Sequence, residues 1–439
     1  MKLQSRKKWT VNGTSRVQPA QETLEKVIPI SKKIGVTRLA DITDMDVLRI
    51  PNYSAVLPGT EDYIWVYSGK GPTKEHAMAS ALMESIERYS SLPSGGPRKF
   101  VRSTYSDLSK SYDVLHPDRV IEPVTFVYRT DMLMDWLPGY DLVSGREIMV
   151  PASVALFRYT PAPPAVNPFA YFHTNGLASG NVMEEAVCHA LCEVIERDAM
   201  SLAELRASAI PFHILRTIVY SLNAAGFSVS PIPANKFVDD PSTFPDVDIS
   251  ETDFEPVKNL VSKFKHSGIS LTIKDITSDI GIPTFNASSV EWITHDYGYL
   301  AEGHGTHPDA RIALLRAITE VSQTRAANIH GARDDLRKIR YGEQSTDDNR
   351  AWQFMPSTKK IKFSMIRTFF NEDILDDIRL ILSQLESIGL NQVIIVDLTN
   401  PDIGVPVVRA IVPGLETFKI TKTVMGVRAR ACFGQWIGR

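Results

Sequence analysis

The feature that most constrains this chain is an internal repeat of an acidic helical sequence. Residues 81–88 read ALMESIER, and residues 190–197, which lie 109 positions later, read ALCEVIER. A glycine stands 13 residues before the first glutamate of each copy, at Gly71 and Gly180. A third, degenerate copy, AITEVSQ at residues 317–323, follows the segment GHGTHPD. Such a self-match indicates one helix-and-loop element that the fold uses three times.

The repeat places acidic and basic side chains on one helix face. Each strong copy carries two glutamates and an arginine at positions i, i+3 and i+4: Glu84, Glu87 and Arg88, then Glu193, Glu196 and Arg197. Side chains at this spacing are neighbours on a helix surface. One copy alone would be explained equally well by a solvated helix with Glu–Arg pairs. Two copies with matched glycines favour two helices that face each other across a site.

Four facing carboxylates predict a cation between them, because like charges that are close raise each other's pKa. Oxygen ligands select Mg²⁺ or Ca²⁺, and the helices contain no Glu-x-x-His motif of a di-iron centre. Glycine-containing loops, helix N-termini and arginines bind phosphate. We therefore expect Mg²⁺ between the carboxylates and a triphosphate. The chain has no G-x-x-x-x-G-K-[ST] motif and no kinase loop set, so this ATP site would be non-standard.

The segment EGHGTH offers a rival site. Glu302, His304 and His307 could serve a carboxylate-bridged transition-metal hydrolase. The two histidines are three residues apart around a glycine and have no fixed helix face, so we expect instead a loop near the nucleotide or the peptide. Stoichiometric zinc or iron would favour the hydrolase, whereas Mg²⁺ dependence with ATP binding would favour the nucleotide site.

Composition excludes several classes of protein. The formal net charge of −3 gives no general attraction to nucleic acid or to an anionic membrane, and no apolar run is long enough to span a bilayer. The three cysteines, Cys188, Cys192 and Cys432, are too few for a disulfide framework. The N-terminus is basic, but no apolar segment follows it, so it is not a secretory signal. We expect a cytoplasmic protein that binds neither nucleic acid nor membrane.

The order of the predicted elements indicates a mixed α/β (α+β) fold. Helices alternate with strands, and hairpins also occur. The expected elements are a helix at 21–33, strands at 37–42 and 63–67, a hairpin turn at 143–146, and two helix–strand units at 257–274 and 374–396. We divide the chain into an N-terminal segment that contributes to the nucleotide site (1–60), a catalytic core (61–430) and a C-terminal tail (431–439).

The same motifs resemble those of the YcaO family, whose members use ATP to modify peptide backbone amides. The most specific segments are Ser68–Arg88, Thr174–Ala199 and Thr319–Arg325, and the supporting ones are GTSR (13–16), IGVTRLADIT (34–43) and VPGLE (412–416). The resemblance covers about Gly13 to Glu416. It implies a YcaO-type fold, with repeated helix–loop elements and mixed β-sheets around an ATP site.

The resemblance also implies roles for individual residues. It implies Mg²⁺ ligands at Glu84, Glu87, Glu193 and Glu196, and a catalytic set of Glu84, Glu193 and Arg197. It implies nucleotide contacts by Arg16, Thr23, Arg88, Asn181, Glu185, Arg197, Glu320 and Gln323. The sequence departs from the family at two points: Arg16 lies in GTSR where many relatives have GTHR, and Ala178 stands where some relatives place a serine beside the nucleotide. These departures bear on the finer nucleotide contacts, including one by Ser179.

The reaction implied is O-phosphorylation of a peptide amide, followed by attack of a nucleophile on its carbon. Azoline-forming relatives often end in a proline-rich tail, whereas no proline follows Pro413 here. The best fit is the stand-alone thioamide-forming branch, which resembles the archaeal members that act on a glycine of methyl-coenzyme M reductase. We expect a peptide or protein substrate, a homodimer, and sulfide or a sulfur-donor protein, such as a TfuA-like partner, as the sulfur source. The alternatives are an azoline-forming cyclodehydratase and an inactive relative that only binds peptide.

Overall fold

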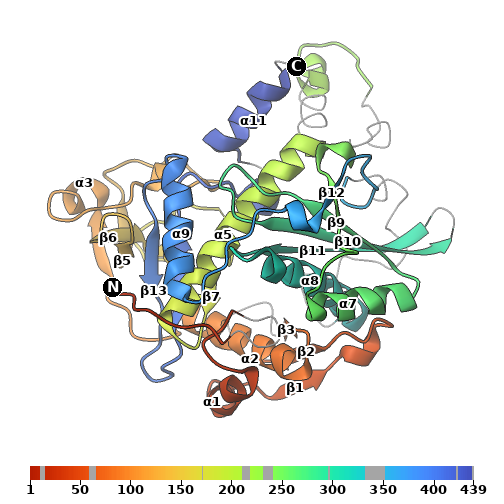
Figure 1. Cartoon of the computed structure of the whole chain (residues 1–439). Coiled ribbons are helices and arrows are strands. Elements are labelled where there is room, and N and C mark those ends of the chain that lie inside the picture. The colour runs from red at the N-terminus through yellow and green to blue at the C-terminus, as the bar shows by residue number, and fades with distance from the viewer. Residues whose placement is uncertain are drawn as a thin grey trace.

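The structure, a computed structural model, describes residues 1–9, 15–58, 66–170, 172–209, 218–230, 241–294, 297–331, 352–421 and 424–437. These residues form three β-sheets with helices packed between and around them (Figure 1). The mixed α/β fold expected from the sequence is confirmed. No described helix is both long and apolar enough to cross a membrane.

The three sheets differ in size and position. The first has the order β1 (Arg38–Asp41), β2 (Asn52–Val56), β3 (Val66–Lys70). The second has the order β11 (Tyr297–Thr306), β10 (Thr284–Thr294), β9 (Ser270–Asp275), β8 (Asp246–Asp248), β12 (Lys360–Lys362). The third has the order β4 (Val101–Thr104), β5 (Leu133–Asp141), β13 (Ile394–Asp397), β14 (Val407–Ile411), β7 (Leu177–Ser179), with β6 (Arg146–Pro151) paired to β5.

The helices fill the spaces between these sheets. The acidic helices are α2 (Lys74–Ser91), α5 (Met183–Glu204) and α8 (Ala310–His330). The others are α1 (Ala20–Lys33), α3 (Tyr105–Leu108), α4 (Ala152–Ala155), α7 (Glu255–His266), α9 (Ile374–Ser387), α10 (Phe418–Thr421) and α11 (Val427–Ile437). In Figure 1, α5 crosses the middle of the molecule between the six-stranded and the five-stranded sheets.

The three matched sequences form three strand–helix units, which confirms the repeat. Strand β3 leads into α2, β7 into α5 and β11 into α8. In the first and third units the strand lies directly on the helix backbone. A Cβ on Gly69 would be 2.1 Å from the Ala77 carbonyl oxygen, and a Cβ on Gly305 would be 2.0 Å from that of Ala313. Only glycine permits so close an approach at these two positions.

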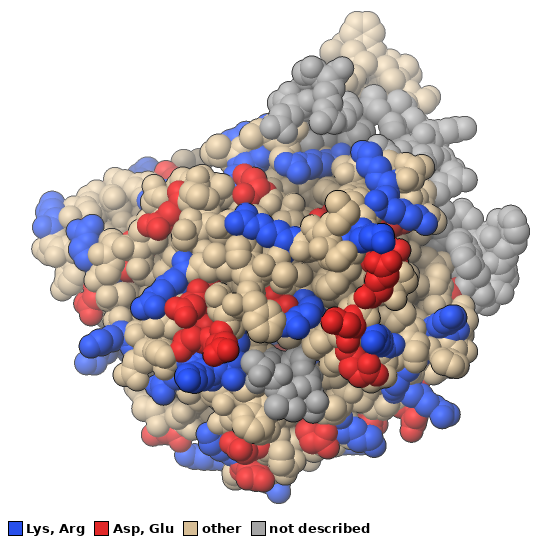
Figure 2. All heavy atoms as spheres, viewed as in Figure 1, with Lys and Arg blue, Asp and Glu red and all other residues tan. Residues whose placement is uncertain are grey.

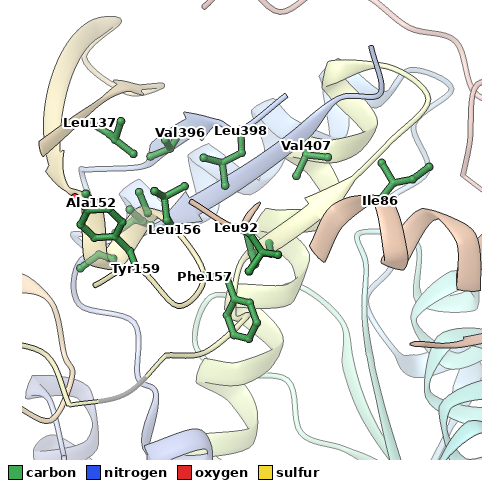
Figure 3. Close-up of a cluster of buried hydrophobic side chains, with 14 of the residues drawn as sticks. Ile86, Leu92, Leu137, Ala152, Leu156, Phe157, Tyr159, Val396, Leu398 and Val407 are labelled. Carbon is green, nitrogen blue, oxygen red and sulfur yellow. The ribbon is translucent and has the colours of Figure 1, made fainter. Parts of the chain in front are cut away.

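Apolar side chains from distant segments form the cores. The largest cluster joins α1 and α2 to β5, β6 and β13, and Figure 3 shows Ile86, Leu137, Val396 and Val407 within it. A second cluster lies between α5, α9 and the strands β13 and β14, and a third lies between α7, α8 and the strands β9, β10 and β11. On the face shown in Figure 2 the described basic and acidic side chains are mixed, in keeping with the small net charge.

Most of the expected elements are present within a residue or two. The helix at 21–33 is α1, the strand at 37–42 is β1, the hairpin turn joins β5 to β6, and the two helix–strand units are α7–β9 and α9–β13. Residues 63–65 lie outside the described residues, and β3 begins at Val66. One expectation was wrong: residues 303–306 form the end of β11 and not a loop. Gly303 and Gly305 have no side chains and lie directly against α8, so this segment can extend as a strand beside the helix.

Candidate active site

A cavity of about 590 Å³ is lined by α2, α5, α8, β3 and the segment that precedes α1. All twelve residues that the sequence predicted for the site contribute to its lining: Arg16, Thr23, Glu84, Glu87, Arg88, Asn181, Glu185, Glu193, Glu196, Arg197, Glu320 and Gln323. Segments as far apart as residues 16 and 323 therefore meet at one place. The roles assigned to the individual side chains remain predictions.

An edge strand brings the two glutamate pairs together. Strand β7 pairs with β14 and is the last strand in the order of its sheet. The Ser179 hydroxyl donates to the Met83 carbonyl of α2 at 3.1 Å. The backbone N–H groups of Ser179 and Gly176 partly offset the rise in the pKa of Glu87 and of Glu193, respectively. The chain entering α5 therefore lies beside one carboxylate from each helix.

Glu87 and Glu196 are buried, Glu84 and Glu193 are half-buried, and together they crowd negative charge around the cavity. Burial raises the pKa of Glu87 to about 8, and the charges of Glu193 and Glu84 add to the rise although Arg88 opposes it. Burial likewise raises the pKa values of Glu193 and Glu196. Glu320 differs, because the Lys70 ammonium and His304 outweigh its burial and lower its pKa. A bound cation would relieve this excess of negative charge.

The two arginines keep hydrogen-bond donors available. Arg88 lies 3.3 Å from Glu84 and 3.7 Å from Glu87, yet its Nη1 is buried without a hydrogen-bond partner among the described residues. Arg197 makes a long contact from Nη1 to the Met200 sulfur at 3.8 Å. Buried donors that lack a strong acceptor suit an anionic ligand such as phosphate.

The segment before α1 and the first turns of α1 form another part of the cavity wall. The Thr23 hydroxyl donates to Asn181 Oδ1 at 2.9 Å. Glu185 accepts from the Val17 N–H at 2.6 Å and from the Asn181 N–H at 2.8 Å, and it lies 3.6 Å from Arg16. These contacts tie the residues before α1 to the start of α5.

In the sequence, Asn181 and Glu184 have the spacing of a capping box at the start of α5, but that prediction is wrong. Helix α5 begins at Met183 after Val182, so Glu185 is the residue placed to accept from Asn181. Glu184 instead accepts from the Gln4 N–H at 2.6 Å and pairs with Arg6 at 3.3 Å. The motif failed because the helix starts one residue later than it implied.

Sequence reasoning missed several polar residues of the lining, among them Ser68, Lys70, His189 and Arg316. Lys70 forms an ion pair with Glu320, and Gln323 donates to the Ser68 carbonyl. Arg316 donates to His189 Nδ1 at 2.9 Å and to the Thr306 carbonyl at 3.0 Å. The available signal was helical spacing, because Arg316 precedes Glu320, and His189 precedes Glu193, by one turn.

The rival transition-metal site does not assemble. His304 lies by Glu320 at 3.9 Å, whereas His307 lies past the end of β11 and 3.8 Å from Asp377. The ligand atoms of Cys188, His307 and Asp377 do lie within 4.8 Å of one another. However, the Asp309 N–H donates to His307 Nδ1 at 2.9 Å, which leaves the proton on Nε2. Nε2 then has no lone pair for a metal, so this trio does not fit one.

The glutamates suit Mg²⁺ with phosphates better than an all-protein metal cage. Within the described ranges, no three of their carboxylates approach within 4.8 Å of one another. Mg²⁺ is usually held by one or two carboxylates together with phosphate oxygens and water, so wider spacing around a cavity is what such an ion requires. The buried carboxylates and the unpartnered Arg88 nitrogen therefore fit a Mg²⁺–nucleotide complex.

Replacing Arg197 by alanine should weaken the binding of a non-hydrolysable ATP analogue at least about tenfold, since a hydrogen bond to a charged group contributes roughly 1.5–3 kcal/mol. Arg197 lines the cavity and lacks a strong acceptor. The matched control is Arg206→Ala, at an exposed arginine just after the same helix. Calorimetric titration of both variants is the measurement. Equal affinities would mean that Arg197 only pairs with its neighbouring glutamates.

This chain matches a known protein family and several curated sequences. A family model described as "YcaO cyclodehydratase, ATP-ad Mg2+-binding" matches residues 68–416. An uncharacterized protein of Methanothermobacter thermautotrophicus is 36% identical over 94% of this chain and 98% of its own length. A Rhizobium leguminosarum bv. trifolii protein, described as uncharacterized and in the tfuA 3′ region, is 31% identical over 91% of this chain and 88% of its own.

Solved structures share the fold. The structure of YcaO from Methanopyrus kandleri bound with AMPPCP and Mg²⁺ has a TM-score of 0.68 at 22% identity and covers 96% of this chain and 97% of that one. A heterocyclase in complex with substrate and cofactor has a TM-score of 0.71 at 23% identity over 95% of this chain. This chain spans 54% of the heterocyclase's length. At these identities the likeness establishes the architecture alone.

Proposed function

Since this chain belongs to the YcaO family, we propose that it is an ATP- and Mg²⁺-dependent enzyme that activates a peptide backbone amide and converts it to a thioamide. The observation that carries the proposal is the single cavity onto which both glutamate pairs and both following arginines project. The description of the family as ATP- and Mg²⁺-binding supports the cofactors.

Different residues of the cavity would bind different parts of the Mg²⁺–ATP complex. Arg16, Thr23 and the Asn181–Glu185 pair, which contact one another in the cavity wall, would hold the nucleoside side of ATP. The glutamates of α2 and α5 would hold Mg²⁺, which when bound offsets the charge of the transferring phosphoryl group. Arg88 and Arg197 would donate to phosphate oxygens and orient the γ-phosphoryl toward the amide oxygen.

The chemistry follows from the weakness of an amide as an electrophile. Transfer of the γ-phosphoryl to the amide oxygen forms an O–P bond and releases ADP. Hydrosulfide then forms a C–S bond, and the C–O bond breaks with phosphate leaving, which gives thioamide, ADP and phosphate from amide, ATP and HS⁻. A glycine amide, the kind modified in methyl-coenzyme M reductase by archaeal family members, suits this step because its carbonyl is uncrowded and its backbone is flexible.

One comparison favours sulfur over a side-chain nucleophile. The Rhizobium relative is described by its place in the tfuA 3′ region, which agrees with a TfuA-like sulfur-donor partner. A second candidate function is azoline formation at Cys, Ser or Thr. It is supported by the cyclodehydratase description of the family and by the likeness to a heterocyclase.

The deciding experiment is mass spectrometry of candidate peptides after incubation with the protein, ATP, Mg²⁺ and sulfide. We expect a glycine-containing substrate to gain the mass difference between sulfur and oxygen, and only when ATP is present. Peptides with Cys, Ser or Thr beside the target should gain the same mass and keep their water. Clean loss of water without sulfide would overturn the thioamide product and support the cyclodehydratase instead.

A further inference from the structure

A buried arginine lies behind the acidic helices and outside the lining of the cavity. Arg409 occupies the middle of β14, opposite Val396 on β13 and Leu177 on β7, and it is 4% exposed. No described carboxylate lies within ion-pair distance of its guanidinium, and burial lowers its pKa to about 10. A buried charge is costly unless other contacts compensate it.

Arg409 belongs to a hydrogen-bonded network of three side chains, which also includes His173 and Glu122. Arg409 Nη1 donates to the His173 carbonyl at 3.0 Å, and Nη2 donates to His173 Nδ1 at 3.1 Å. The Asn175 N–H also donates to Nδ1 at 3.2 Å, so the ring proton sits on Nε2. From there it is donated to Glu122 Oε1 at 2.5 Å. Both ring nitrogens are engaged, so His173 is not free to act as a general base.

This network is attached to the turn 173–176, which carries part of the site. His173 is followed by Thr174, which lines the cavity and whose carbonyl accepts from the Leu177 N–H at 2.9 Å. Gly176 lies in this turn at φ +79°, its carbonyl accepts from the Ala410 N–H at 2.8 Å, and an added Cβ would be 2.8 Å from Val194, the residue after Glu193. The Gly176 N–H also favours the charged form of Glu193. Arg409 and Ala410 of β14 thus fix both ends of a turn that packs beside a predicted metal ligand.

We infer that Glu122, His173 and Arg409 form a positioning clamp for the metal site: they fix the turn 173–176, which packs against α5 beside Glu193. The inference rests on the proposed function, because it concerns the same Mg²⁺–nucleotide site. Glu122 and His173 lie 51 residues apart, and His173 and Arg409 lie 236 apart, so the clamp ties three distant segments to one glutamate. Side chains that orient metal ligands from behind typically change metal affinity or activity about 10–100-fold when they are removed.

The test is calorimetric binding of AMPPCP with and without Mg²⁺, together with hydrogen exchange of the amides in the turn. We expect His173→Ala to weaken Mg²⁺-dependent binding at least about tenfold. Binding in the presence of EDTA should change much less, and the Gly176 amide should exchange faster. Glu122→Ala should act in the same direction, whereas Glu122→Gln, whose carbonyl still accepts from Nε2, should restore most of the affinity.

Two comparisons separate a specific effect on the metal site from a general loss of stability. Arg102→Ala removes the bidentate Arg102–Asp135 contact, at 2.8 and 3.0 Å, at the far edge of the same sheet and serves as a stability control. If Mg²⁺ affinity simply followed Tm across all variants, or if His173→Ala bound like wild type, the clamp would be disproved. Should His173→Ala not fold, the Glu122 pair carries the test. A wild-type protein without Mg²⁺-dependent AMPPCP binding would overturn the proposed function itself, and the clamp with it.

Discussion

Replacing Glu193 by glutamine should abolish Mg²⁺-dependent ATP hydrolysis while leaving the fold intact. Glu193 lines the cavity and is half-buried, and this partial burial raises its pKa. Glutamine keeps the shape but removes the charge that a metal ion requires. Because a metal ion contributes several kcal/mol to phosphoryl transfer and about 1.4 kcal/mol is a factor of ten, turnover should fall on the order of a thousandfold.

Steady-state phosphate release over a range of Mg²⁺ concentrations measures this loss. Glu84→Gln on the facing helix should behave in the same way. The matched control is Glu204→Gln at the end of α5, outside the cavity, where Glu204 lies 3.5 Å from Lys419. Turnover within a few-fold of wild type in both Glu84→Gln and Glu193→Gln would disprove the nucleotide site.

Replacing Gly69 by alanine should cost about 3 kcal/mol or more of the free energy of unfolding, at the upper end of what overpacking costs. Its Cβ would lie 2.1 Å from the Ala77 carbonyl oxygen and 2.2 Å from the Ala81 nitrogen. Both are backbone atoms of α2, so no side chain can move aside, and the strand must leave the helix. The same helix carries Glu84 and Glu87, so nucleotide binding should be lost together with stability.

Urea denaturation of Gly69→Ala against Gly268→Ala separates crowding from backbone strain. Gly268 has φ +68° and nothing within 4 Å of an added Cβ. Its substitution should therefore cost only about 1–2 kcal/mol for the left-handed conformation. If Gly69→Ala lost the same or less free energy of unfolding than Gly268→Ala, β3 and α2 could separate without penalty. That result would contradict the close contact of Gly69 with the α2 backbone.

The sequence came closest where contacts are local. The spacing of Glu84, Glu87 and Arg88 predicted one helix face, and that face lines the cavity. Asp309, the last residue of GHGTHPD, is of a type that favours helix N-caps, and it does cap α8, accepting from the Arg311 N–H at 3.0 Å. Both results depend on residues within one helical turn, where geometry follows directly from separation along the chain.

The sequence misled where a segment's neighbours were unknown. His304 and His307 read as one candidate metal site, but β11 ends between them. His304 therefore faces Glu320 in the cavity, while His307 lies beside Asp377 of α9. Two residues that are three positions apart share a side in a helix but not in a strand. Here Gly303 and Gly305 pack against α8, and this contact places the segment in a strand up to Thr306.

By itself, the sequence determined the repeated acidic helices, their charged faces and the family, because each is encoded by residues close together in the chain. Only the tertiary structure decided how those helices are joined. Strand β7 lies between the two glutamate-bearing helices, Lys70 pairs with Glu320 across 250 residues, and Arg409 reaches His173 across 236. Such pairs leave no periodic trace in the sequence, since the packing of whole sheets and helices brings them together.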